Sequence, residues 1–369
     1  MAVNAKNVGK TVLRVILRTL LVIFTVVLIV AGALVFALNM IFNGPAPAAR
    51  NVLTMSLSES SAMKWVPALF LGEDMVEQIR ADVVLPLPEE VSDGSGVVVN
   101  PPVATDDEWK DYPDGIRIEE VHGDNYNAYV MMIRDPSRVY LATSTEKYTT
   151  AIDGTRIHNQ IVKEGAVAAI NGGAFNDDGT TGSYIGSLPI GLTVSGGEIK
   201  WDDGQSWMGF AGFNDQDVLV VANTMSAKQA KELNIRDGCC FGPVLIMNGV
   251  VNDAEFSGNS GFNPRTAIGQ RADGVVLFVC IDGRQAGSLG GTYADIINIM
   301  VEYGAVNACN LDGGASSTML YKDTEGQFKD SGKVYYSEDV VMINNYAILQ
   351  EMPRKMPTFF MVRPEESEG

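Results

Sequence analysis

The sequence predicts an α+β fold, in which a mixed β-sheet domain with a few packed helices follows a single transmembrane helix. Two kinds of segment support the domain: short apolar runs of strand length, separated by Gly, Asn or Asp turns, and a few longer segments with helix caps. A long apolar segment near the N-terminus supports the membrane helix. The 369 residues, 46% of them hydrophobic, are enough for one large domain or two modest ones.

Residues 19–43 contain no charged side chain and are dominated by Leu, Val, Ile, Phe and Ala, so they are long enough to span a bilayer as a helix. The preceding tail, residues 1–18, contains several basic residues. The positive-inside rule therefore places this tail in the cytoplasm and the rest of the chain outside. A cleaved signal peptide is the alternative, because residues 46–49 are small. The length of the apolar run favours a retained anchor.

The remaining chain divides by composition. Residues 44–81 are expected to form a membrane-proximal helical segment, which either lies along the membrane or packs on the domain. Residues 82–114 are acidic and rich in proline, which opposes regular structure and predicts a linker. The globular domain is expected over 115–352, followed by a C-terminal tail at 353–369.

Within the domain, strands alternate with three helices. The helices are expected at 155–164, 226–233 and 292–303; the last two begin with a Ser or Thr cap, and the first and last end at Gly. The expected strands are residues 116–121, 128–133, 139–143, 167–170, 191–195, 198–201, 208–213, 218–222, 244–248, 275–281, 305–311 and 342–349.

Charge and composition exclude several functions. With 45 acidic and 27 basic residues the net charge is −18, which repels nucleic acid, and only two histidines are present for metal binding or catalysis. The cysteines Cys239, Cys240, Cys280 and Cys309 lack zinc-ligand spacing. Cys280 and Cys309 fall in apolar strands and are expected to be buried free thiols.

No cofactor is expected. Residues 176–180 carry two Asp and a Gly, which could bind calcium, but the EF-hand spacing is missing and a solvated turn is the favoured interpretation. Phe175, Tyr184 and Trp207 are candidates for a sugar platform, with ordinary core packing as the alternative.

Three apolar runs each end on an Asn or Asp followed by Gly, at Asn171, Asp282 and Asp312. In sheets with parallel strands, ligands bind outside the carboxyl ends of the strands. The helix expected at 292–303 joins the second of these strands to the third, as in a right-handed parallel βαβ unit. We therefore expect the three side chains to converge on one cleft, although ordinary Asn/Asp-Gly turns would give the same pattern.

Five motifs occur in a fixed order: N-G-G-A-F (171–175), G-P-V-L (242–245), P-R-T-A-I-G (264–269), D-G-R (282–284) and N-L-D-G-G-A-S-S-T-M (310–319). Together, within about residues 115–350, they resemble the phosphodiester glycosidase family. The resemblance implies hydrolysis of a sugar-1-phosphodiester, such as an N-acetylglucosamine phosphodiester. It also implies an Arg before the last strand, which residues 337–340 do not supply.

Glycoside cleavage typically uses two carboxylates. Asp312 is expected to be the catalytic base or nucleophile, and Asp282 the second carboxylate or a partner that orients an arginine. A phosphate leaving group needs positive donors, which Arg265 and Arg284 would supply. The alternative is that Arg284 only pairs with Asp282 and that Arg265 braces a loop.

The other expected contacts are neutral donors and acceptors. Asn171 and the amides that follow it suit sugar hydroxyls or a phosphate oxygen, and the hydroxyls after Asp312 add further donors. A serine nucleophile is possible, but no nearby histidine would activate it. The substrate-binding residues expected are Asn171, Gly172, Gly173, Arg265, Thr266, Arg284, Gly313, Gly314, Ser316, Ser317 and Thr318.

The expected function is therefore that of a membrane-anchored glycosidase with its domain outside the cytoplasm, hydrolysing sugar-1-phosphodiesters in cell-envelope or exopolysaccharide glycans. Its partners are the carbohydrate phosphodiester and, through residues 19–43, the membrane; no nucleic-acid partner is expected. Two alternatives remain: a glycan or peptidoglycan hydrolase that uses no phosphate, and a non-catalytic factor for polysaccharide binding or assembly.

Overall fold

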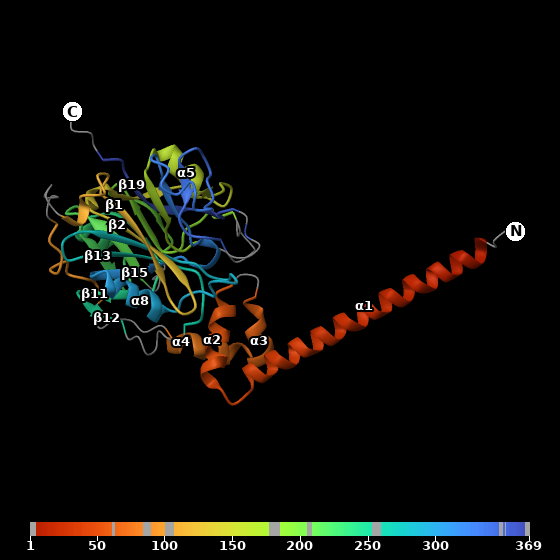
Figure 1. Ribbon diagram of the computed structural model, residues 1–369. Coiled ribbons are helices and arrows are strands. Elements are labelled where there is room, and N and C mark those ends of the chain that lie inside the picture. The colour runs from red at the N-terminus through yellow and green to blue at the C-terminus, as the bar shows by residue number, and fades with distance from the viewer. Residues whose placement is uncertain are drawn as a thin grey trace.

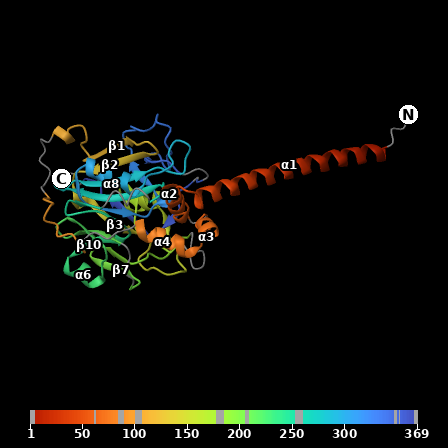
Figure 2. The same ribbon diagram turned by 90° about the horizontal axis from the view of Figure 1, so that it is seen from below.

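The computed structural model describes residues 5–60, 63–83, 90–99, 107–176, 185–204, 209–252, 260–346, 350 and 352–365. It confirms the α+β fold, with β-sheets packed face to face and helices on their outer sides. Helix α1 (Ala5–Phe42) projects from one end of this body, as Figure 1 and the view from below in Figure 2 both show.

Helix α1 has the length and composition of a membrane span. The candidate span, Val12–Phe42, covers 31 residues; its most apolar window of 18 residues has a mean hydropathy of 3.1, and none of that window is buried in the protein. At about 1.5 Å per residue, such a helix exceeds the hydrocarbon thickness of a bilayer. The Phe42 ring, at its end, stacks on Phe70 with 5.1 Å between ring centroids.

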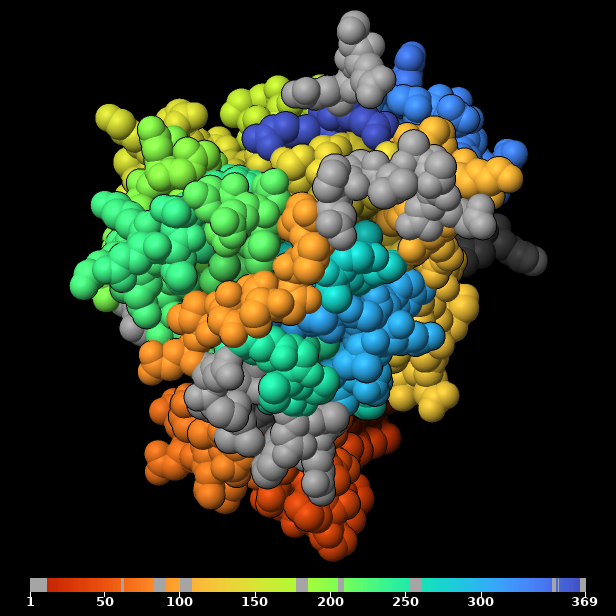
Figure 3. Space-filling model, turned by 90° about the vertical axis from the view of Figure 1, so that its left-hand side faces the viewer, coloured from red at the N-terminus to blue at the C-terminus, as the bar shows by residue number. Residues whose placement is uncertain are grey.

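The membrane-proximal segment forms three helices, α2 (Pro47–Ser58), α3 (Trp65–Leu71) and α4 (Glu73–Val83). They lie between α1 and the sheets (Figures 1 and 2), and Met55 and Ile79 are buried in a cluster shared with the domain. The segment therefore packs on the domain. In the space-filling view of Figure 3 these red and orange helices form the lower end of the molecule.

A seven-stranded sheet carries the site, in the order β1-β2-β14-β13-β15-β11-β12. Alternating apolar residues line both of its faces, so its central strands are buried on both sides. Its strands are β1 (Ile116–His122), β2 (Asn127–Ile133), β11 (Val244–Met247), β12 (Val250–Val251), β13 (Arg265–Arg271), β14 (Val276–Ile281) and β15 (Ala305–Leu311).

The expected parallel βαβ unit is wrong in one respect. Strands β14 and β15 run in the same direction, but β13 lies between them and pairs antiparallel with both. Helix α8 (Tyr293–Glu302) therefore connects strands that are not neighbours. Asp282 and Asp312 still follow strand ends on the same edge, on either side of Arg265.

A second sheet has the order β17-β16-β5-β19-β3, and a third the order β7-β6-β10-β8-β9. All strand pairs in these sheets are antiparallel. The strands are β3 (Val139–Thr143), β5 (Ala168–Asn171), β6 (Leu192–Ser195), β7 (Glu198–Asp202), β8 (Phe210–Asn214), β9 (Leu219–Ala222), β10 (Ile235–Cys240), β16 (Met319–Lys322), β17 (Val340–Met342) and β19 (Thr358–Val362). A short ribbon pairs β4 (Thr155–Arg156) with β18 (Lys355–Met356).

The expected C-terminal tail contains strand β19, which lies between β5 and β3 and is fully buried. This strand is difficult to predict from the sequence, because the prolines at 353 and 357 lie just before it and proline opposes strand pairing. The expected strand at 342–349 is wrong except at its first residue: β17 covers Val340–Met342, residues 343–346 form no strand, and residues 347–349 lie outside the described part. The last strand of the described part is thus β19, and Arg354 lies four residues before its start.

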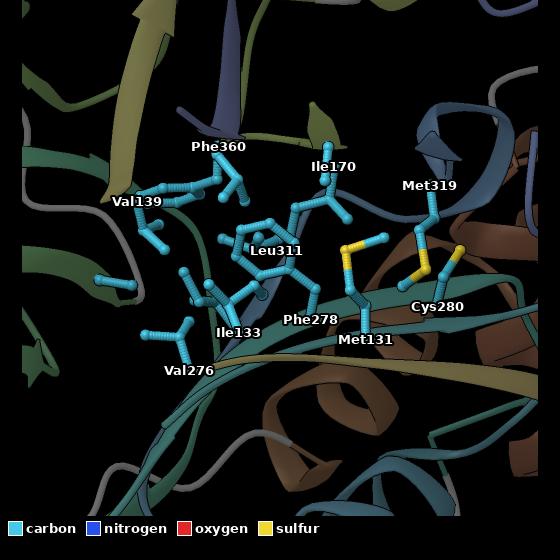
Figure 4. Packing of buried hydrophobic residues seen from close by; sticks show 14 of the residues in the cluster. Met131, Ile133, Val139, Ile170, Val276, Phe278, Cys280, Leu311, Met319 and Phe360 are labelled. Atoms are coloured by element: carbon cyan, nitrogen blue, oxygen red, sulfur yellow. The ribbon is translucent and has the colours of Figure 1, made fainter. Parts of the chain in front are cut away.

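The main core fills the space where the three sheets meet. Figure 4 shows Phe278 of the seven-stranded sheet facing Ile170 and Phe360 of the second sheet. Each of these side chains is fully buried. Cys280 and Cys309 lie in the same core as free thiols, as expected, and burial raises the pKa of both.

Helices cover the outer faces. Helix α8 packs on the outer face of the seven-stranded sheet, with Thr292 and Asp295 forming a capping box at its start. Helix α5 (Ile157–Glu164) covers the second sheet and ends at Gly165 in the left-handed conformation. Helix α6 (Ala227–Glu232) packs against the third sheet, and its capping box begins at Ser226.

Part of the expected linker is packed on the domain. The Ser92 amide donates to the Val221 carbonyl over 2.9 Å, and Val91 bridges Ala222. Figure 3 shows this orange stretch crossing the molecule between green and blue surfaces. The linker thus extends the edge of the third sheet.

Candidate functional site

A pocket of about 470 Å³ opens where β15 ends, between the seven-stranded sheet and the membrane-proximal helices. One wall comes from the strand ends and loops of the domain, and the other from α2 and α4. The lining residues are Met55, Glu59, Glu77, Arg80, Ala81, Phe241, Gly242, Pro264, Arg265, Tyr293, Asn310, Asp312, Gly313 and Gly314.

Asp312 lies in this pocket, half-buried, directly after β15. Its Oδ1 accepts a hydrogen bond of 2.9 Å from the amide of Gly313, and its main-chain carbonyl accepts one of 2.6 Å from Nδ2 of Asn171. These bonds fix the turn and hold the carboxylate at the pocket wall. The geometry suits a carboxylate that acts on a bound ligand.

Arg265 also lines the pocket, but only 3% of it is exposed. Its Nε donates to the Gly291 carbonyl over 2.7 Å, and its Nη2 donates to the carbonyls of Ser260 and Gly261 over 3.0 and 3.1 Å. The guanidinium lies 3.9 Å from the centroid of the Tyr293 ring. Arg265 therefore braces the loop before β13, which is the alternative that the sequence left open.

Arg284 lies beside Asn263 and Glu59 rather than beside Asp282. Its Nη2 donates to Oδ1 of Asn263 over 2.9 Å and to the Glu59 carbonyl over 3.4 Å. Burial lowers the pKa of its guanidinium, and the nearby Glu59 opposes that shift. The alternative that Arg284 only pairs with Asp282 is therefore wrong, since Arg284 contacts Asn263 and Glu59 instead.

Asp282 does not reach the pocket. Its two carboxylate oxygens accept hydrogen bonds of 2.7 Å from the amide and the side chain of Asn345, and the residue is 1% exposed. Burial raises the pKa of this carboxyl group. The expectation that Asp282 is a second catalytic carboxylate in the cleft of Asp312 must therefore be corrected.

The reason lies in the alternation of side chains along a strand. Ile281 faces α8 on the outer side of the sheet, so the next residue, Asp282, points to the inner side. Leu311 faces the inner core, so Asp312 points to the outer side, where the pocket lies. Both residues follow strand ends on one edge, but on opposite faces.

Asn171, Gly172, Gly173 and Thr266 hold the strands together. Asn171 is fully buried and its Oδ1 accepts from the Thr266 hydroxyl over 2.9 Å. The amides of Gly172 and Gly173 both donate to Thr358, over 3.0 and 3.1 Å, so neither is open to a ligand. A Cβ on Gly172 would lie 2.4 Å from the Thr358 hydroxyl oxygen, which explains the glycine by close packing.

Gly313 and Gly314 line the pocket, whereas the three hydroxyls beyond them do not. Ser316, Ser317 and Thr318 are buried, and their hydroxyl oxygens have no hydrogen-bond partner among the described residues. Their expected role as ligand donors would require a ligand or water to reach beneath the turn. Gly314 has a φ of 62°, a conformation that favours glycine.

No pattern in the sequence indicates that α2 and α4 reach the site. Glu59 ends α2 and its Oε2 accepts a 2.6 Å hydrogen bond from Nδ2 of Asn263 and lies 3.4 Å from Nη2 of Arg265. Arg80 of α4 lines the same pocket. No spacing of residues 44–81 distinguishes these two side chains from ordinary surface charges.

Two residues of the domain also escaped prediction. Asn310 is 2% exposed and lines the pocket; its Nδ2 donates to the Gly242 carbonyl over 3.1 Å, and its Oδ1 has no partner among the described residues. Phe241 offers the pocket an apolar wall.

The other weighed candidates do not add to the site. Phe175 is 7% exposed and its ring packs under Arg354, 4.7 Å from the guanidinium carbon, which supports the core interpretation. Tyr184, Trp207 and most of the possible calcium turn, 177–180, lie outside the described residues. Within the part of the chain that the structure describes, no group of three or more His, Cys, Asp or Glu side chains could hold a metal ion.

The chain is similar to several known proteins. It is 27% identical over 191 residues to the SPbeta prophage-derived uncharacterized protein YomE of Bacillus subtilis (strain 168); the match covers 50% of this chain and about a quarter (27%) of that relative. Among solved structures, the catalytic domain of zebrafish N-acetylglucosamine-1-phosphodiester alpha-N-acetylglucosaminidase matches with a TM-score of 0.47 and 18% identity, over 68% of this chain and 82% of that one.

A putative exported protein of Burkholderia pseudomallei K96243 matches with a TM-score of 0.43 and 17% identity, over 65% of this chain and 74% of the other. The model of the phosphodiester glycosidase family matches residues 164–363, from the end of α5 through β19. This range is more than half of the chain and contains the turn that holds Asp312 in the pocket. The chain therefore belongs to the phosphodiester glycosidase family.

Proposed function

We propose that this protein hydrolyses a sugar-1-phosphodiester, such as an N-acetylglucosamine phosphodiester, in glycans of the cell envelope or of an exopolysaccharide. The observation that carries the proposal is that Asp312 lines a pocket within a domain of the phosphodiester glycosidase family. Arg265 and Arg80 line this pocket, and Arg284 lies directly behind it. Glu59 and Glu77 line the same pocket and pair with the two lining arginines, so Arg80, the more exposed of the two, is the cation that suits a phosphate leaving group.

In the proposed reaction, the bond between the sugar C1 and the phosphoryl oxygen breaks, and its electron pair stays on that oxygen. Asp312 either attacks C1 or takes a proton from a water that does so; both routes leave a free sugar and a phosphate monoester. Positive charge near the pocket stabilises the phosphate as it leaves. Phe241 and Asn310 would hold the sugar.

Oxygen labelling tests this reaction. The purified full-length protein is incubated in ¹⁸O-labelled water with methyl N-acetylglucosamine-1-phosphodiester, and both products are analysed by mass spectrometry. Glycosidase chemistry places the label on C1 of the sugar, because that bond breaks. Label in the phosphate would indicate a phosphodiesterase. Sugar release only from a neutral glycan or peptidoglycan would favour the phosphate-free hydrolase, and binding without turnover would favour the assembly factor.

We further propose that α1 is a retained signal anchor and that the domain lies outside the cytoplasm. The support is the exposed apolar length of Val12–Phe42 and the basic residues before it. A reporter enzyme active only outside the cytoplasm, fused after Gly369, is expected to be active. The same reporter fused after the basic tail, before the apolar segment, should be silent. The opposite pattern would contradict this orientation.

A further inference from the structure

Five of the fourteen residues that line the pocket lie outside the part of the chain that the family model matches. The family model begins at residue 164, whereas α2 and α4 end more than eighty residues earlier, at Ser58 and Val83. These helices are held to the domain by Met55 and Ile79, which are buried against the outer face of the seven-stranded sheet. Their position is therefore part of the folded core.

The carboxylates that line the pocket, among the described residues, are Asp312, Glu59 and Glu77. Glu77 is 74% exposed at its side chain and pairs with Arg80 on its own helix. The Glu59 side chain is 26% exposed and is bound from the domain side by Asn263 and Arg265. Because Asp282 points to the other face of the sheet, Glu59 is the partly buried carboxylate that lines the pocket together with Asp312.

Resting on the function proposed above, we infer that Glu59, supplied by membrane-proximal helix α2, is the second catalytic carboxylate of this active site, the acid that protonates the departing phosphoryl oxygen. The Glu59 carboxyl proton passes to that oxygen as the C1–O bond breaks. The water that adds to C1 gives up one proton, which restores the carboxyl group. The products are the sugar, with a new hydroxyl at C1, and the phosphate monoester.

The surroundings of Glu59 suit this role. Burial raises the pKa of its carboxyl group more than the charges of Arg265, Arg284 and Arg80 lower it. Tyr293, beneath the Arg265 guanidinium, has its own pKa raised to about 12 and stays neutral. A carboxyl group that keeps its proton to a higher pH than usual can act as an acid and does not repel an incoming phosphodiester.

The test compares Glu59→Gln and Glu59→Asp with the wild-type full-length protein, over a range of pH. The matched control is Asp74→Asn, which removes one exposed acid of α4 that does not line the pocket. Glutamine preserves the size of the side chain and the main-chain carbonyl that Arg284 contacts. We expect Glu59→Gln to lower kcat by about 100-fold, a typical loss for a general acid.

The pH dependence of kcat distinguishes an acid-catalytic role of Glu59 from a structural one. In the wild type, kcat should fall as the pH rises through the raised pKa of Glu59, because the acid form is lost. Glu59→Gln should lose this alkaline limb, Glu59→Asp should retain it at reduced kcat, and Asp74→Asn should match the wild type. Thermal unfolding of each variant shows whether the fold is kept.

Three outcomes would overturn the inference. A Glu59→Gln variant with unchanged kcat would show that the carboxyl group is dispensable. A faster variant would show that Glu59 blocks the pocket rather than serving it. A slower variant with a lower melting temperature and the wild-type pH limb would show a purely structural role. In each case a wild type that hydrolyses the phosphodiester leaves the proposed function standing; a wild type without glycosidase activity removes both proposals.

Discussion

Asp312→Asn is expected to lower turnover of a sugar phosphodiester by about 100-fold to 10,000-fold, the range of a lost acid or base catalyst. Asparagine has the same shape, and its Oδ1 can still accept from the Gly313 amide, as Asp312 does over 2.9 Å. The turn should therefore survive, with the free energy of unfolding changed by no more than about 1 kcal/mol. The measurements are kcat, substrate Kd and urea unfolding.

Asp282→Asn is the matched control, because it makes the same chemical change at the other strand end. Both oxygens of Asp282 accept from Asn345, so an amide NH2 in that place would face a donor. This variant should lose about 1–3 kcal/mol of stability while its folded fraction keeps its turnover. If Asp312→Asn remained active and Asp282→Asn did not, the assignment of the catalytic carboxylate would be reversed.

Arg265→Ala is expected to have the largest effect on stability, about 3–5 kcal/mol, the cost of removing one partner from a buried charged contact. The change would leave the carbonyls of Gly291, Ser260 and Gly261 without their donor. It would also uncover the face of Tyr293. Because the side chain braces the loop, turnover should fall by similar factors for a phosphodiester and for a neutral aryl glycoside. Urea unfolding and a two-substrate comparison measure the two effects.

Arg80→Ala is the comparison for this variant, since Arg80 lines the same pocket from an exposed position. Within the described part of the chain, its ion-pair partner is Glu77, in an exposed pair worth about 0–1 kcal/mol. Its stability should therefore stay near that of the wild type. If Arg265→Ala instead folded normally and lost activity only on the phosphodiester, the arginine would be a phosphate contact, as the sequence first suggested.

Several features follow from local sequence. The sequence predicts the caps at Ser226 and Thr292 and the glycine stop at Gly165; the structure confirms them and shows that each cap is part of a capping box. They depend on residues three or four positions apart, so a short stretch of sequence contains all the necessary information. The long apolar helix and the Asp-Gly-Gly turn at Asp312 were predictable for the same reason.

Other features depend on residues far apart in the chain. Strand β13 lies between β14 and β15, and β19 lies between β5 and β3. No local sequence pattern predicts either of these strand pairings. The buried strands are apolar on both faces, so their composition does not show which way the residue after the strand will point. The sequence therefore placed Asp282 and Asp312 on one edge but could not place them on opposite faces.

The sequence by itself determined that the chain has an apolar helix, a set of short strands with Asn or Asp at three of their ends, and motifs of one glycosidase family. Only the tertiary structure decided which of these side chains share a pocket. Glu59 and Asp312 are separated by more than 250 residues, and they line one cavity because buried apolar contacts seat α2 on the seven-stranded sheet. Such packing depends on the complementary shapes of large surfaces. Short-range patterns of residue type contain no information about these shapes.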